Sequence, residues 1–140
     1  MPYVTQDDIK TLMPADYLAQ CLADEGEDSA VVFARIAAAA SNAVDAALAQ
    51  AYTVPFASPV PSLVSEAARI FCAEMLYMRR GVPPDANPFT ARATEIRKKL
   101  DRVGNGKEPL QPGAAANASD SVAIVTEPSR LNQPGAMLFL

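Results

Sequence analysis

Apolar residues recur at every third or fourth position within three long stretches of the chain that contain no proline. These stretches are residues 15–54, 62–82 and 89–108. Proline lacks a backbone N–H and clashes with the preceding helical turn, so these stretches are where long helices can form. For a chain of 140 residues, this spacing predicts a mainly α fold, a small bundle of four to five helices.

The N-terminal segment predicts two short helices before the first long one. Thr5 stands where its hydroxyl can cap a helix that runs to about residue 13, with acidic residues in its first turn. Pro14 begins a second short helix, which is expected to end before an acidic loop at residues 24–28.

The longest helix is expected to begin at about residue 29 and to end near residue 51. Asp28 or Ser29 is placed to cap its start, and its end is set by Pro55, because residues just before a proline avoid the helical region. Its many alanines favour a helix and permit a close neighbour. Polar residues interrupt it, so we expect a soluble helix and no membrane span. Its apolar face consists of Val32 or Phe33, Ile36, Ala40, Val44, Leu48 and Ala51.

Two further helices follow a proline-rich connector at residues 55–61. Ser62 is expected to cap a central helix over about 63–80, and Gly81 suits its C-terminal stop. A last, basic helix should run from about residue 89 to 103 and end at Gly104. The apolar stripe of the central helix consists of Val64, Ala67, Ala68, Phe71, Met75 and Met78.

The pattern changes after residue 104, which predicts a helical domain at 1–104 and an extended C-terminal arm at 105–140. Residues 105–120 resemble a flexible linker, and residues 121–140 hold a predicted short β-strand and an apolar end. Fully extended, the arm could span roughly 100 Å. One interpretation is a disordered tail; the other is strand addition to another subunit, because exposed apolar side chains are costly in water.

The arm supplies most of the candidate residues for a subunit or partner interface. They share an apolar or arginine side chain: Val122, Ile124, Val125, Arg130, Leu131, Met137, Leu138, Phe139 and Leu140.

Charge is distributed unevenly along the chain, whose formal net charge is −4. Residues 1–50 hold eight acids and two bases, whereas residues 51–103 hold five acids and eight bases. An acidic chain is a poor candidate for wrapping nucleic acid. Arg97, Lys98 and Arg102 on the basic helix form either a solvated face or a contact with an acidic neighbouring surface.

The composition argues against several kinds of catalytic site. The chain has no histidine, which excludes imidazole bases and histidine ligands. Its two cysteines, Cys21 and Cys72, lie in apolar helical patterns and are expected to be buried free thiols in a reducing compartment. No phosphate-binding glycine loop or calcium loop is complete. We therefore predict no enzyme activity, no catalytic or metal-binding residues and no cofactor, and the N-terminus carries no secretory pattern.

The order of these features resembles the Mu-like phage head-tail adaptor, or connector, family. The resemblance rests on a Tyr-x-Thr opening at residues 3–5, a proline-rich connector, an apolar and then a basic helix, and a tail with a short strand and an apolar end. Its most specific element is the run Asp45-x-x-Leu48-x-x-x-Tyr52-x-x-Pro55.

This resemblance implies a structural role in the virion. Copies of the chain would form a homo-oligomeric ring of twelve below the portal protein, continue the DNA channel without binding DNA specifically, and dock the stopper or tail-completion protein. The expected location is the virion neck, after assembly in the host cytoplasm. An acidic lining would let DNA slide, and unlike charged patches would suit a head-to-tail ring. The alternative is a regulatory or partner-binding helical domain whose C-terminal tail folds on its target.

Overall fold

A computed structural model of the chain describes residues 2–23 and 26–110, and these residues form helices and loops without a β-strand. The mainly α prediction is confirmed for them, whereas the strand predicted within residues 121–126 lies outside the described residues. The five helices are α1 (Gln6–Lys10), α2 (Ala15–Leu22), α3 (Ser29–Leu48), α4 (Ser62–Arg79) and α5 (Thr90–Gly104).

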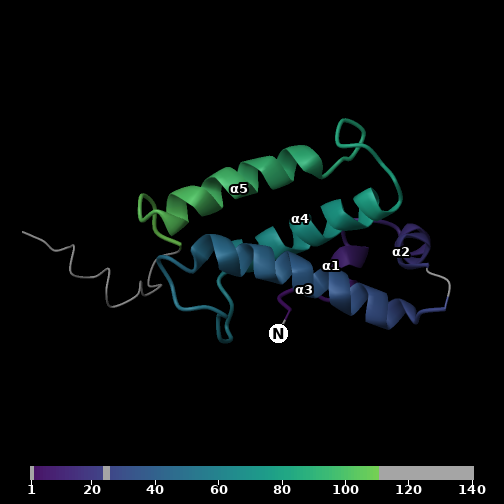
Figure 1. The fold of residues 1–140 in the computed structure, drawn as a ribbon, viewed down its shortest axis with the longest axis horizontal. Coiled ribbons are helices and arrows are strands. Elements are labelled where there is room, and N and C mark those ends of the chain that lie inside the picture. The colour runs from purple at the N-terminus through teal and green to yellow at the C-terminus, as the bar shows by residue number, and fades with distance from the viewer. Residues whose placement is uncertain (1, 24–25, 111–140) are drawn as a thin grey trace, which may run out of the picture.

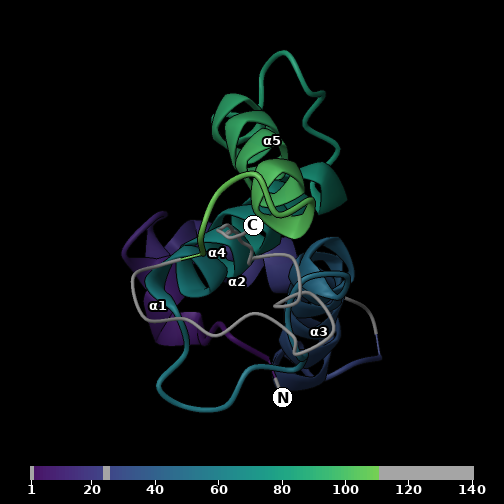
Figure 2. The same cartoon turned by 90° about the vertical axis from the view of Figure 1, so that its left-hand side faces the viewer.

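Helix α4 is the centre of the bundle, as its broad apolar stripe predicts. It packs against each of the other four helices. Figure 1 shows α3 and α5 running along α4, and Figure 2 shows α5 on one side of α4 with α1, α2 and α3 around the others. The C-terminal ends of α3 and α5 lie at the same end of the molecule, so the connector at 49–61 and the chain after α5 are brought together there (Figure 1).

The helix starts agree with the predicted caps at two places and differ at a third. The Thr5 hydroxyl accepts from the Asp8 N–H and the Asp8 carboxylate accepts from the Thr5 N–H, which forms a capping box. Asp28 caps α3 through the Ala30 N–H. The prediction for Ser62 is wrong: it is the first residue of α4, and Pro61 precedes it with no side-chain cap, because proline already fixes a φ suited to helix entry.

The core is formed mainly by the predicted apolar faces, with two departures on α4. Met78 is 54% exposed, because the buried residues of α4 already end at Leu76. Glu74, by contrast, is buried at 5% exposure. The predicted stop at Gly81 is confirmed, since its φ of +83° is a conformation that suits glycine.

Helix α3 combines a buried face with a composition that would also suit a membrane. By length and hydropathy it is the one helix of residues 2–23 and 26–110 that could span a bilayer. It lies instead in the core, to which it contributes seven buried residues. The predicted burial of both cysteines is confirmed, and burial raises the pKa of the Cys72 thiol to about 12.

Candidate assembly interface

Three of the twelve candidate interface residues lie on α5, and the nine on the arm lie outside the described residues. Arg97 reaches across to α4, where its guanidinium pairs with the carboxylate of Glu74 and sits 5.0 Å from the centre of the Phe71 ring. The Glu74 side chain is only 7% exposed, whereas that of Arg97 is half exposed. A buried carboxylate is costly unless a cation is paired with it. Arg97 therefore serves to compensate the buried charge of Glu74 within its own chain.

The other two candidates on α5, like Arg97, are at least half exposed and lie beside carboxylates. Lys98 approaches Glu95 at 3.5 Å, and the Arg102 Nε donates to Glu108 at 3.0 Å. Lys99 approaches the second oxygen of Glu108 at 3.6 Å. The hydrogen bond from Arg102 lowers the pKa of Glu108. The basic character of α5 is thus largely balanced within its own chain.

A group of polar and aromatic side chains holds the N-terminal segment to the end of α3. The Tyr3 hydroxyl donates to Asp45 at 2.6 Å and accepts from the Phe56 N–H at 2.9 Å. The Tyr3 N–H donates to the hydroxyl of Ser41, also at 2.9 Å. Burial and the Asp45 carboxylate raise the pKa of Tyr3 to about 12. The Tyr3 hydroxyl thus joins the N-terminal segment to both α3 and the connector.

The same group extends to the place where the chain leaves α5. The buried hydroxyl of Tyr52 accepts from the backbone N–H of Leu110 at 3.1 Å, and Leu110 is 5% exposed. The Tyr52 ring also lies against Phe56, with centroids 6.2 Å apart. We name this group the tail junction; its members are Tyr3, Ser41, Asp45, Tyr52, Phe56 and Leu110.

The tail junction explains the run that carried the family resemblance. Asp45 and Tyr52 of this run each accept a hydrogen bond in the tail junction, and Leu48 between them is fully buried. Sequence reasoning singled out the run but not its partners, Tyr3 and Leu110, which lie 42 and 58 residues away along the chain. The Tyr-x-Thr opening was the available signal, because Tyr3 is a polar aromatic residue beside a predicted cap.

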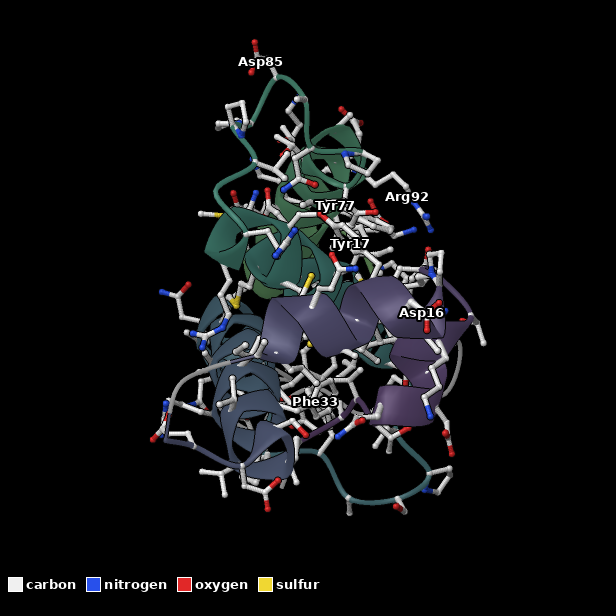
Figure 3. The ribbon with its side chains drawn as sticks, turned by 90° about the vertical axis from the view of Figure 1, so that its right-hand side faces the viewer. Asp16, Tyr17, Phe33, Tyr77, Asp85 and Arg92 are labelled. Carbon is white, nitrogen blue, oxygen red and sulfur yellow. The ribbon has the colours of Figure 1, made fainter. Side chains whose placement is uncertain are left out.

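The opposite end of the bundle is joined by aromatic rings. The ring of Tyr17 on α2 lies against that of Tyr77 on α4, with centroids 4.8 Å apart (Figure 3). The Tyr77 ring also lies against Phe89, with centroids 5.5 Å apart. The guanidinium of Arg80 lies 5.8 Å from the centre of the Tyr17 ring. These contacts fasten α2 and the loop before α5 to α4.

A shallow groove separates α4 from the first half of α5. Its volume is about 340 Å³, and its walls are mostly apolar. An ion pair crosses it, since Arg92 lies 3.8 Å from Glu66 and both side chains are about half exposed. We call this the α4–α5 groove; its lining residues are Glu66, Ala91, Arg92, Glu95 and Ile96.

Comparison with known proteins identifies the family. No curated protein and no solved structure matches the chain. The sequence model of the family described as Bacteriophage Mu, Gp36 matches residues 3–126. This match begins at Tyr3, covers the whole helical body and includes Val122, Ile124 and Val125 of the arm. The chain is therefore a Mu-like phage protein and belongs to the bacteriophage Mu Gp36 family.

Proposed function

We propose that the chain is a head-tail adaptor, a structural virion protein that forms a ring below the portal, continues the DNA channel and docks the stopper or tail. The observation that carries the proposal is the extent of the family match, which continues from the body to residue 126 of the arm. A match of that extent is expected when the arm takes part in the shared function.

The organisation of the body supports an arm that works outside it. The backbone N–H of Leu110, near the start of the arm, donates a hydrogen bond to the hydroxyl of Tyr52. The arm therefore starts from a fixed point at one end of the bundle. Residues 137–140 are four successive apolar residues, and their burial by a partner lowers the free energy. A neighbouring subunit, the portal protein or the stopper would provide that cover.

The charges of the body fit a ring with one repelling surface. Asp7 on α1 and Asp16 on α2 are exposed, in the acidic half of the chain, whereas the cations of α5 are paired locally. A channel lined by the α1–α2 side would repel DNA phosphates and let the duplex slide.

Removal of residues 119–140 from the phage-encoded protein tests the proposal. We expect filled heads without tails, counted by electron microscopy, and an unchanged far-ultraviolet circular dichroism spectrum of the purified truncated chain. A matched truncation after residue 126 keeps the segment that the family model covers. Normal tailed particles from the chain that lacks residues 119–140 would overturn the adaptor proposal.

Copy number provides a second measurement on intact virions. Quantitative mass spectrometry should find this chain and the portal protein in equal amounts, as expected for two stacked rings of twelve. Absence of the chain from purified virions, together with a stoichiometric complex in the host cell, would instead favour a regulatory, partner-binding module.

A further inference from the structure

The α4–α5 groove is a shallow, mostly apolar recess bordered by charged side chains. Its volume of about 340 Å³ is at the low end of the roughly 300–1,000 Å³ that small-molecule sites enclose, which suits a few side chains. Ile96 lies partly buried in its wall and Ala91 is exposed beside it.

We propose that the α4–α5 groove binds residues 137–140 of a neighbouring copy of this chain. This inference rests on the proposed ring and names the surface that receives its arm. The segment reads Met-Leu-Phe-Leu, and methionine and phenylalanine are enriched at the centres of protein interfaces. Three of its side chains are branched or aromatic, so they fill a recess with little loss of rotamer freedom.

The length of chain beyond Leu110 allows this contact between copies. Twenty-six residues separate Leu110 from Met137, so the segment could lie up to about 90 Å from the tail junction. A body of this size has a radius of gyration of about 13 Å. The arm can therefore reach past its own body to the groove of the next subunit, which is a head-to-tail contact between unlike surfaces.

Charge favours the same occupant. The groove is bordered by two carboxylates, Glu66 and Glu95, and by one cation, Arg92. Arg130 is the one charged side chain of residues 128–140, so this segment brings no acidic side chain to the two carboxylates of the rim. The ion pair between Arg92 and Glu66 is loose at 3.8 Å, which leaves the rim able to rearrange around an inserted side chain.

A peptide titration tests the groove. The probe is a fluorescent synthetic peptide with the sequence of residues 128–140, and the receptor is the full chain with Leu138→Ser and Phe139→Ser, which removes the competing internal segment. Fluorescence anisotropy should show saturable binding. Ala91→Gln in the receptor should weaken it at least tenfold, because the longer side chain enters the groove.

The matched control is Ala38→Gln, the same substitution at an exposed position of α3. It should leave the affinity unchanged, and both receptors should show equal thermal unfolding midpoints. Absence of saturable binding, or equal loss of affinity in the two variants, would overturn the proposal.

Cross-linking separates contact between copies from contact within one chain. A chain with Ala91→Cys is mixed with a chain with Phe139→Cys and oxidised, while Cys21 and Cys72 stay buried. A disulfide-linked dimer is expected. A chain that carries both substitutions is oxidised in parallel, and a link that forms only within that chain would overturn the assignment to a neighbour. If truncation blocks tail joining but the peptide does not bind, the groove assignment fails and the adaptor proposal stands.

Discussion

The tail junction and the outer face of α5 are held together by different physical means. The tail junction uses directed hydrogen bonds among partly buried groups, centred on the Tyr3 and Tyr52 hydroxyls. The outer face of α5 uses ion pairs whose side chains are mostly half exposed, such as Arg102 with Glu108. Buried hydrogen bonds are costly to break, whereas exposed ion pairs are screened by solvent and salt. The comparison shows that a strongly charged helix can depend on uncharged contacts for its position.

One uncharged contact of α5, a close approach to α3, lies at its C-terminal end. Gly104 is buried against the backbone of α3 at Ala47 and Leu48. A side chain there would overlap the carbonyl oxygen of Ala47. Glycine is thus used inside a helix for close approach, at some cost in helix propensity.

Gly104→Ala should have the largest effect on this comparison. We expect it to lower the free energy of unfolding by about 1–3 kcal/mol, because two packed helix backbones cannot move apart freely. Alanine is otherwise the better helix former by about 1 kcal/mol. A loss of stability would therefore show that the steric overlap with α3 outweighs helix propensity. Urea unfolding measures it, with Asn105→Ala, an exposed neighbouring position, as the control. A variant more stable than the natural chain would show that the close approach does not hold α5.

Tyr3→Phe should come next, with a loss of about 1–2 kcal/mol at neutral pH, because Asp45 and the Phe56 N–H lose their partner. The pKa of Tyr3 is raised from its ordinary 10.0 to about 12, so folding favours the protonated phenol. This contribution is complete below pH 10 and is lost as the pH rises from 10 to 12.

Urea unfolding at pH 8 and at pH 11 checks the Tyr3 prediction. The stability difference between the natural chain and Tyr3→Phe should be smaller at pH 11 than at pH 8. Tyr17→Phe, in the stacked pair at the other end, serves as the control. A difference that stays constant with pH would contradict the role assigned to the Tyr3 hydroxyl.

Arg97→Ala and Lys98→Ala should give the smallest and most discriminating effects. Loss of Arg97 leaves the buried Glu74 carboxylate without its cation, and the half-exposed position of Arg97 limits the cost to about 1 kcal/mol. Lys98→Ala should not shift the thermal midpoint measurably. Equal shifts in the two variants would mean that Arg97 is no more structural than its neighbour.

The fold could be predicted from the sequence to the extent that local rules determine it. Prolines and apolar spacing located the long helices, and Thr5 and Gly81 marked ends that the structure confirms. Ser62 and Met78 were misassigned, because cap use and burial depend on what packs nearby.

The candidate site depends more on distant contacts than the fold does. The basic residues of α5 were recognised, but their partners were not, because Glu74 lies on another helix and its burial follows from tertiary packing. The tail junction likewise joins residues far apart in sequence. The role of the arm stays a prediction.

The bond between Tyr52 and Leu110 has a mechanical consequence. Tension applied to the chain beyond residue 110 is shared between the covalent path into α5 and the turn after α3. The reason is that Tyr52, in that turn, accepts a hydrogen bond from the Leu110 N–H. A pull is thereby delivered to the two helices that flank α4, and peeling of α5 from its free end is opposed. A particle that pulls on this subunit therefore loads the C-terminal ends of α3 and α5 together.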